Sequence, residues 1–101
     1  LIGWNAHEEF ESDNLTDQFR ATLENIIAVL AQDGAGPQHM VRMTWYITDK
    51  GEYLANLKEM GAIYRDVMGK NYPAMACVEV SALMEDRAKI EIETTAVIEE
   101  T

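Results

Sequence analysis

Residues 40–48 read Met-Val-Arg-Met-Thr-Trp-Tyr-Ile-Thr, and their character alternates with a period of two. In a β-strand this alternation sends successive side chains to opposite faces of the sheet. The predicted core face carries Val41, Met43, Trp45 and Ile47, and the opposite face carries Arg42, Thr44 and Tyr46. The stretch therefore predicts a strand with one face in the core and one face away from it.

A helix is predicted before this strand, over roughly residues 14–33. Ser12, Asp13 and Asn14 are residue types that cap helix N-termini. Apolar residues then recur at helical spacing, at Phe19, Leu23, Ile26, Ile27 and Leu30. Gly34 is suited to ending a helix, and the Gly-Pro pair at 36–37 prevents its continuation.

A second helix is predicted after the strand, with Asp49 as its N-cap and Gly69 at its end. Its apolar stripe is expected to comprise Tyr53, Leu54, Leu57, Met60, Ile63 or Tyr64, Val67 and Met68. This stripe would pack the helix against the same sheet as the first one.

Two more strands are predicted in the last third of the chain. The first runs from Pro73 to about Leu83, and a turn at 84–87 separates it from the second, which runs from about Lys89 to Ile98. In the first, Ala74, Ala76, Val78, Val80 and Ala82 are expected to face the helices, and Met75, Cys77, Glu79 and Ser81 to face away. In the second, Ile90 and Ile92 are expected in the core. The apolar residues 1–4 are expected to be the end of a further strand.

This order of elements is that of an α+β domain in which two helices cover one face of a sheet. The uncovered face is expected to carry Arg42, Thr44, Tyr46, Met75, Cys77, Glu79, Ser81, Glu91 and Glu93. A face that mixes polar, acidic and apolar side chains suits a hydrated subunit interface or a cleft between subunits.

Composition indicates one globular domain over residues 1–101, with 48% hydrophobic and 26% charged residues. Eighteen acidic residues against eight basic ones give a net charge of −10, which argues against nucleic acid and anionic membrane surfaces as partners. No apolar run approaches the ~20 residues that span a bilayer, and no leader peptide is expected. Cys77 is the sole cysteine, which fits a reducing compartment, so we expect a cytoplasmic protein.

The residues leave two interpretations open for each candidate functional group. Glu91 and Glu93 share one strand face, where a carboxylate could move a proton or aim a water molecule. The alternative is a solvated acidic face, or ion pairs with Arg42 or Lys89. Cys77 is either a nucleophile activated by a nearby cation or a small, buried apolar residue.

Neither metal nor cofactor is expected from the motifs present. His7 and His39 stand near loop segments without partners at metal-ligand spacing, and we interpret both as surface residues. The sequence contains no glycine-rich phosphate loop, zinc spacing or nucleophile elbow.

Four stretches together resemble a known family. Residues 73–80 (PAMACVEV) and 89–93 (KIEIE) resemble its signature, and residues 18–25 (QFRATLEN) and 43–49 (MTWYITD) support the match. The family is the Rid, or YjgF-like, family of reactive intermediate deaminases. The resemblance runs through nearly the whole chain in the right order.

The resemblance implies a chorismate-mutase-like α+β fold and a homotrimer with a small-molecule cleft between neighbouring subunits. Members hydrolyse reactive enamines and imines, such as 2-aminoacrylate, to 2-keto acids and ammonia without metal or cofactor. Their key arginine, in a Pro-Ala-Arg segment, clamps the substrate carboxylate, and a glutamate of the final strand positions the water. The glutamate corresponds to Glu91 and a cleft cysteine corresponds to Cys77.

The chain departs from the family pattern at several positions. Met75 stands where the arginine is expected, and a thioether cannot clamp a carboxylate. A polar contributor on the second helix corresponds to the neighbourhood of Leu57, with Asn56 adjacent. Arg42 is expected on the same face as Met75, as a structural residue or as a substitute cation. The family's N-terminal strand is expected to lie upstream of Leu1, outside this sequence.

Three functions follow as hypotheses. The first is a Rid-type deaminase or related hydrolase of altered specificity, with Glu91 as the tentative catalytic residue and Met75, Cys77, Glu93 and Arg42 around the ligand. The second is a non-catalytic metabolite-binding trimer. The third, an endoribonuclease or translation inhibitor, is the weakest, because a chain of net charge −10 repels RNA.

Overall fold

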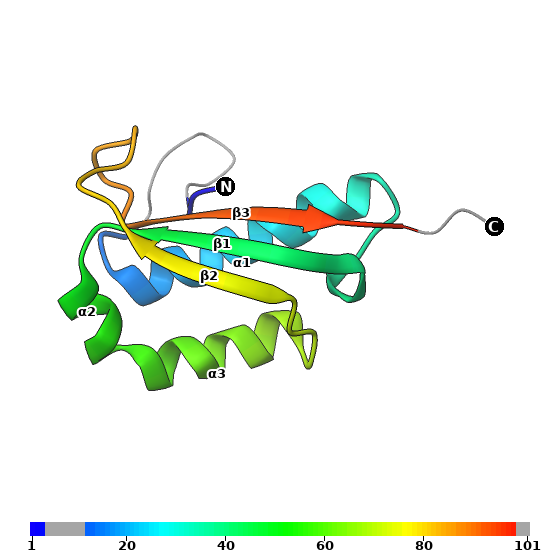
Figure 1. Ribbon diagram of the computed structural model, residues 1–101, viewed down its shortest axis with the longest axis horizontal. Coiled ribbons are helices and arrows are strands. Elements are labelled where there is room, and N and C mark those ends of the chain that lie inside the picture. Colours follow the sequence, from blue (N-terminus) through cyan, green and yellow to red (C-terminus); the bar gives the residue numbers. More distant parts are fainter. Residues whose placement is uncertain (4–11, 99–101) are drawn as a thin grey trace.

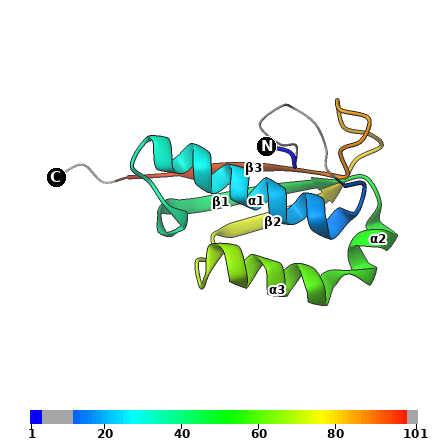
Figure 2. The same cartoon turned by 180° about the vertical axis from the view of Figure 1, so that it is seen from behind.

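The structure is a computed structural model that describes residues 1–3 and 12–98. In chain order it contains α1 (Leu15–Gln32), the short 3-10 helix η1 (Pro37–His39), β1 (Met40–Ile47), α2 (Lys50–Ala55), α3 (Leu57–Met68), β2 (Ala74–Glu79) and β3 (Ile90–Ala96). The described strands form one sheet in the order β2-β1-β3, with β1 parallel to β2 and antiparallel to β3. The open face of the sheet is in front in Figure 1, and the helices are in front in Figure 2. The predicted α+β arrangement, with helices on one face, is confirmed.

The first predicted helix is confirmed as α1. Its N-cap is Asn14, whose side chain accepts the backbone N–H groups of Thr16 and Asp17. This satisfies two of the donors that a helix start leaves without partners. Just beyond its end, Gly34 has a φ of +72°, a conformation that glycine adopts without steric cost.

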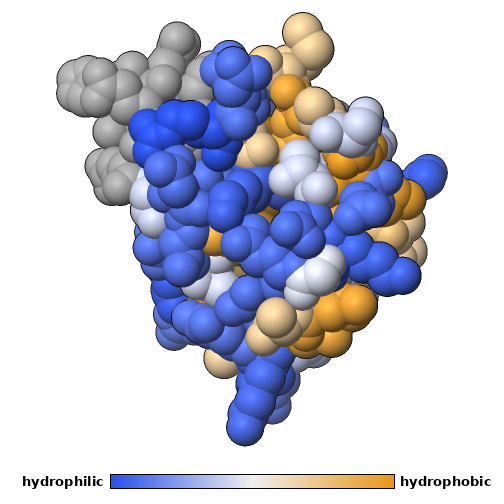
Figure 3. All heavy atoms as spheres, turned by 90° about the vertical axis from the view of Figure 1, so that its left-hand side faces the viewer, coloured by the Kyte–Doolittle hydropathy of each residue, from blue (hydrophilic) through white to orange (hydrophobic). Residues whose placement is uncertain are grey.

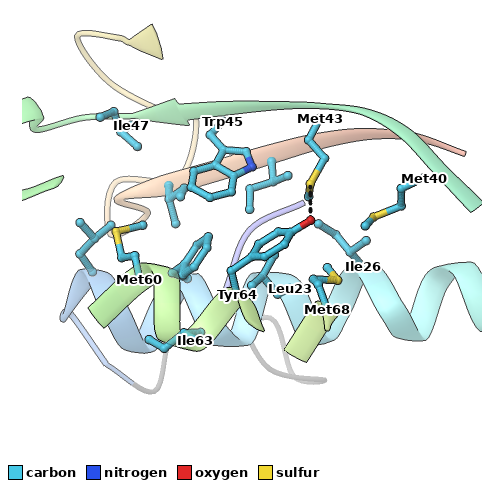
Figure 4. Close-up of a cluster of buried hydrophobic side chains, with 14 residues drawn as sticks. Leu23, Ile26, Met40, Met43, Trp45, Ile47, Met60, Ile63, Tyr64 and Met68 are labelled. Carbon is cyan, nitrogen blue, oxygen red and sulfur yellow. Dashed lines mark hydrogen bonds between the residues drawn. The ribbon is translucent and has the colours of Figure 1, made fainter. Parts of the chain in front are cut away.

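The core lies between the helices and the covered face of the sheet (Figure 4). It contains Leu15, Phe19, Leu23, Ile26, Met40, Met43, Trp45, Ile47, Met60, Ile63, Tyr64, Met68, Ile90 and Ile92. At its centre the rings of Phe19 and Trp45 lie 4.9 Å apart in a tilted arrangement, which aromatic pairs favour. Helices α1 and α3 and strands β1 and β3 all contribute to this cluster, so the sheet and helices stabilise one another.

The predicted second helix is interrupted at Asn56, where the backbone leaves helical geometry (φ −116°, ψ 13°). Asp49 is the N-cap, as predicted, and its side chain accepts the backbone N–H of Glu52. The interruption changes the direction of the helix axis, so one apolar stripe cannot continue through both segments. Leu54 and Leu57 are therefore exposed, and their prediction as core residues is wrong.

One side-chain placement in β1 also differs from the prediction. The pairing of β1 with β3 shifts in register between Met40 and Arg42. Such a bulge interrupts the strict alternation of side chains between the two sides of the sheet. Met40 is consequently buried, and Val41, predicted in the core, is exposed.

The two faces of β2 are reversed relative to the prediction. Met75 pairs with Met43 and Cys77 with Trp45 in the parallel register, and Met43 and Trp45 face the helices. Residues paired side by side in neighbouring strands point to the same face. Met75, Cys77 and Glu79 therefore lie on the helix side, and Ala74, Ala76 and Val78 lie on the open face. The strand also ends at Glu79, before the predicted Leu83.

A buried glutamine side chain forms hydrogen bonds with the segment that leads into β3. Gln18 is only 1% exposed, and its Nε2 donates to the carbonyl oxygens of Ser12 (3.0 Å) and Arg87 (2.9 Å). Its Oε1 accepts the backbone N–H of Lys89 at 2.8 Å. One side chain of α1 thus holds both the start of the helix and the residues just before β3.

At the opposite edge of the sheet, Leu1 exchanges backbone hydrogen bonds with Ile92 of β3. Residues 1–3 do not form a strand, so of the strand end expected at residues 1–4 the structure shows only this pairing with Ile92, and Trp4 lies outside the described residues. In the described part of the chain, no helix is both long and apolar enough to cross a membrane.

Candidate functional site

A cavity of about 250 Å³ opens between α3 and the β1–β2 part of the sheet. Its lining is mostly apolar and aromatic. The residues that line it are Met43, Trp45, Tyr53, Leu57, Met60, Gly61, Tyr64, Arg65, Tyr72, Pro73 and Met75. The volume is just below the range of about 300–1,000 Å³ for small-molecule sites, which are mostly apolar with a few placed polar groups. The cavity therefore suits a small metabolite.

Three aromatic residues form a continuous wall of the cavity. Tyr64 lies between Trp45 and Tyr72, with ring centroids 6.2 Å and 5.6 Å away, and it is stacked on Tyr72. The Tyr64 hydroxyl donates to the carbonyl oxygen of Asn71, and Figure 4 shows it directed toward Met43. The wall is held both by packing and by a hydrogen bond, so its shape is largely preformed.

Met75 lies at the rim of this cavity. It is 49% exposed, and β2 is an outer strand of the described sheet, with β1 on one side and no strand on the other. Other exposed apolar side chains near this edge are Leu54, Leu57, Tyr72 and Val78. Figure 3 shows the end of the molecule where α2 lies: hydrophilic residues cover much of it, and hydrophobic residues gather toward one side.

Cys77 is on the helix side of the sheet, next to Tyr53. Burial raises the pKa of the Cys77 thiol, and a hydrogen bond with Tyr53 offsets part of this increase. Burial likewise raises the pKa of Tyr53. The thiol is therefore protonated at neutral pH, and since the thiolate is the nucleophilic form, these surroundings favour the interpretation of Cys77 as a packing residue.

The pH dependence of Cys77 alkylation should reflect these surroundings. We expect the rate with iodoacetamide to reach half its maximum at a higher pH than for free cysteine, because burial disfavours the charged thiolate. Tyr53→Phe removes the hydrogen bond that lowers the pKa, so its profile should move to still higher pH. A shift of the Tyr53→Phe profile toward lower pH would contradict this account.

Glu91, Glu93 and Arg42 lie on the open face of the sheet. Arg42 and Glu93 line a polar hollow of about 140 Å³, together with Thr44, Tyr46 and Thr95. Glu91 lies on the same face but is not part of this lining. Tyr46 donates its hydroxyl to Glu93 at 3.3 Å, and Glu91 is paired with Tyr46 in the register of β1 and β3. The possible ion pair of these glutamates with Lys89 is not formed, because Lys89 binds Glu52 at 3.0 Å.

The structure divides the predicted site residues into two groups. Met75 and Cys77 lie on the helix side of β2, whereas Arg42, Glu91 and Glu93 lie on the open face of β1 and β3. The expectation that all of them share one face is wrong for Met75 and Cys77. Apart from Glu79 at its exposed end, β2 carries small or apolar side chains on both faces, so its sequence has little of the polarity contrast that sets the orientation of a strand.

The predicted helix positions and histidines have identifiable places. Leu57 lines the cavity, while the Asn56 side chain donates to the carbonyl oxygen of Glu52 within the helix interruption. His39 Nδ1 accepts the backbone N–H of Gly36 at 3.0 Å and so stabilises a turn. His7 lies outside the described residues. Across residues 1–3 and 12–98, no group of three or more His, Cys, Asp or Glu is placed to hold a metal ion.

Arg65 and Gly61 were not predicted as site residues. Both line the cavity, and they are four residues apart on α3. The spacing places them on the same face of the helix. That spacing was visible in the sequence, but without the fold nothing distinguishes this face from any other solvated helix surface.

The described residues form an α+β fold with an apolar cavity beside an outer strand, and small-molecule sites in proteins are commonly of this kind. Residues 1–98 match the family described as Endoribonuclease L-PSP. The chain belongs to this family, which is also named Rid or YjgF/YER057c/UK114. The resemblance noted in the sequence is thereby confirmed.

Relatives of this chain include both sequences and solved structures. "Putative reactive intermediate deaminase TdcF" of Escherichia coli is 34% identical over 84 residues, which are 83% of this chain and 64% of TdcF. The structure of the Rid protein YyfA from Yersinia pestis is 33% identical, with a TM-score of 0.81 over 96% of this chain and 75% of that one. A structure of E. coli TdcF with bound serine is 29% identical, with a TM-score of 0.81 over 97% and 76%.

Proposed function

We propose that the protein is a homotrimer that binds a small molecule at each seam between subunits and hydrolyses an imine-like or enamine-like substrate there. The observation that supports this most directly is the division of the candidate residues. Within one chain β1 separates Glu91 on β3 from Met75 on β2, and the two side chains lie on opposite faces. They can act on one ligand only if two copies contribute.

A cyclic trimer would bring these groups together. Identical subunits can contact each other through two different surfaces. Repetition of this contact forms a closed ring if the rotation between neighbouring subunits returns to the starting subunit. In the proposed ring the outer strand β2 of one copy meets the open sheet face of the next. This contact covers exposed apolar side chains such as Met75 and Val78, and it places Glu91 of one copy beside the cavity rim of another.

The chemistry assigned to this seam is hydrolysis of a C=N bond. Water adds to the carbon of an imine, and the carbon–nitrogen bond then breaks to give a carbonyl compound and ammonia. Glu91 would orient the water and accept its proton, which then passes to the leaving nitrogen. Met75 would favour a substrate without a carboxylate at that position, because a thioether offers no donor to it.

A non-catalytic metabolite-binding trimer is the second candidate. The apolar cavity and the protonated state of the Cys77 thiol favour it, because neither provides an activated nucleophile. The serine bound in the TdcF structure supports a small-molecule ligand for both candidates. Ribonuclease activity is the least favoured function, since the net charge of −10 opposes approach to a phosphate backbone.

The experiment measures both the oligomeric state and the turnover of the parent and of one interface variant. Light scattering at micromolar concentration should give about three times 11.4 kDa. Val78→Glu places a carboxylate on the open face of β2, outside the core, and should yield a folded monomer. Imines without a carboxylate and 2-aminoacrylate, each generated in situ by a coupled enzyme, provide the substrates, and release of the carbonyl product is followed, which is a keto acid only for 2-aminoacrylate.

We expect turnover in the parent and its loss in the Val78→Glu monomer. Binding without turnover in the parent would support the second candidate and overturn the hydrolase. A parent that is monomeric, or a Val78→Glu monomer that turns over substrate as fast as the parent, would overturn the seam as the site.

A further inference from the structure

We propose that helix α2 is a hinged lid of the cavity, with its hinge at Asn56, and that the ion pair between Glu52 and Lys89 holds this lid closed. The inference rests on the proposed small-molecule role of the cavity and adds how access to it is controlled. Four features carry it: the weak burial of α2, the position of Tyr53, the polar contacts that hold the helix, and the apolar mouth of the cavity.

Helix α2 is only loosely attached to the core. None of its six residues is buried, whereas α3 buries four of its twelve. Figures 1 and 2 show α2 at one end of the sheet, at an angle to α3. Elements with few buried apolar contacts open at a lower free-energy cost than core elements. The backbone already leaves helical geometry at Asn56, so α2 can change its direction there while α3 stays in place.

Tyr53 is the residue through which α2 closes the cavity. Its side chain lines the cavity, packs against the core and forms a hydrogen bond with the side chain of Cys77. Among the described residues, the lining of the cavity includes Tyr53 but not Cys77. The ring therefore separates the cavity from the thiol. A movement of α2 away from the sheet would withdraw the ring and extend the cavity as far as Cys77.

Polar contacts at the end of the sheet hold α2 in this closed position. Glu52 Oε2 lies 3.0 Å from Nζ of Lys89, the residue directly before β3. Glu79 Oε2, at the end of β2, accepts the first backbone N–H of the helix at 2.6 Å. The Glu52 and Lys89 side chains are 29% and 33% exposed, against 42% and 67% in the Arg20–Asp66 pair. A pair at this depth is screened less than a fully exposed one, yet it can break and form again without opening the core.

The mouth of the cavity gives the closed lid a role once a ligand is bound. Leu57, Tyr72 and Met75 line the cavity and are still 47%, 65% and 49% exposed. Leu54, on α2 itself, is also exposed. A bound molecule at this mouth would cover part of this apolar surface, which is favourable. Closure of α2 beside it would then exclude water from the ligand.

Two probes report the state of the lid from the two sides of Tyr53. Acrylamide, a small neutral quencher of fluorescence, measures access to Trp45 in the cavity, and Trp4→Phe leaves Trp45 as the single tryptophan. On the other side, Cys77 is the sole cysteine and is modified in parallel with a bulky maleimide dye and with iodoacetamide. Both reagents react with the thiolate, so the ratio of the two rates does not depend on the pKa of the thiol.

Glu52→Gln keeps the shape of the side chain and removes its charge. It should raise both the quenching constant of Trp45 and the bulky-to-small rate ratio at Cys77 by about three- to fivefold, as expected for a partly exposed ion pair. High salt should produce this change in the parent but not in the variant. Lys89→Met should have the same effect, and the double variant should exceed neither single one. Asp66→Asn breaks the Arg20–Asp66 pair elsewhere on the surface and is the matched control, which should behave as the parent does.

A further variant and hydrogen exchange separate lid opening from a general loss of stability. Tyr53→Ala removes the ring between the cavity and the thiol, so the rate ratio should rise, and Glu52→Gln should then add little. In Glu52→Gln the amides of α2 should exchange faster while those of β1 keep their protection. If a folded Glu52→Gln protein keeps the parental quenching and rate ratio, the lid is overturned. It is also overturned if Asp66→Asn has the same effect. These measurements need neither ligand nor turnover, so the hydrolase proposal is decided separately by the assembly and turnover experiment above.

Discussion

Replacing Met75 with arginine is expected to raise the rate of 2-aminoacrylate hydrolysis roughly 10- to 100-fold above that of the parent, because hydrogen bonds to a charged group contribute about 1.5–3 kcal/mol. Met75 lies at the cavity rim, half-exposed on the outer strand β2. A guanidinium there stays in contact with water, so it should be accommodated without loss of the fold. It would provide the carboxylate clamp that the thioether cannot.

The controls for Met75→Arg distinguish a clamp from a general change of charge. Met75→Lys adds a positive charge without the planar fork, and should give a smaller gain than arginine. Glu91→Gln in the Met75→Arg background should remove most of the gain, because the water would lose its base. Release of keto acid is followed beside a reaction without protein. A folded Met75→Arg protein of the parental mass with no gain in rate would contradict the role assigned to position 75.

The difference between β1 and β2 shows how far the sequence could predict the fold. In β1 the alternation of Arg42 with Met43 and Trp45 contrasts a charge with large apolar groups, so the core face was predicted correctly at Met43, Trp45 and Ile47. In β2 the alternating residues are alanine and valine on one face and Met75, Cys77 and Glu79 on the other. A shift by one residue reverses the faces of a strand. The charge of Glu79 did not mark the open face, because this residue ends the strand and is exposed to solvent on the helix side.

The candidate site was predictable only in part for a related reason. Glu91 and Glu93 were correctly placed on an exposed strand face, because Ile90 and Ile92 between and beside them are strongly apolar. Arg65 was not found, because an arginine on an exposed helix surface is ordinary until the fold places a cavity beside it. The position of α3 relative to the sheet, which creates that cavity, depends on long-range packing that no local pattern encodes.

Gln18→Ala is expected to destabilise the protein by about 3 kcal/mol or more, a large part of the ~5–15 kcal/mol typical of a domain. The substitution removes the partners of three main-chain groups, namely the carbonyl oxygens of Ser12 and Arg87 and the N–H of Lys89. Gln18 is nearly completely buried, so water cannot easily replace the amide. Urea denaturation measures the loss in the free energy of unfolding.

Two further measurements separate the hydrogen bonds from the volume of this side chain. Gln18→Leu fills the space and still leaves the three groups unpaired, so it should lose nearly as much stability as alanine. If leucine instead restores the parental stability, the hydrogen bonds contribute little and the effect is one of packing. Hydrogen exchange provides a local readout: the Lys89 amide, protected in the parent by Gln18 Oε1, should exchange faster in both variants.

Gln18→Glu adds a pH dependence whose sign follows from the same contacts. A neutral carboxyl can donate to one carbonyl oxygen and accept from the Lys89 N–H, but a carboxylate would face the Ser12 and Arg87 oxygens without a donor. Burial and these acceptors should raise the pKa of the introduced carboxyl above the ~4.3 of a glutamate in an unfolded chain. Stability relative to the parent should therefore be greatest below that value and fall as pH rises through the folded pKa. If the loss in the free energy of unfolding relative to the parent stays constant with pH, the introduced carboxyl turns outward to solvent. The segment before Glu91 would then be held by contacts other than those of residue 18.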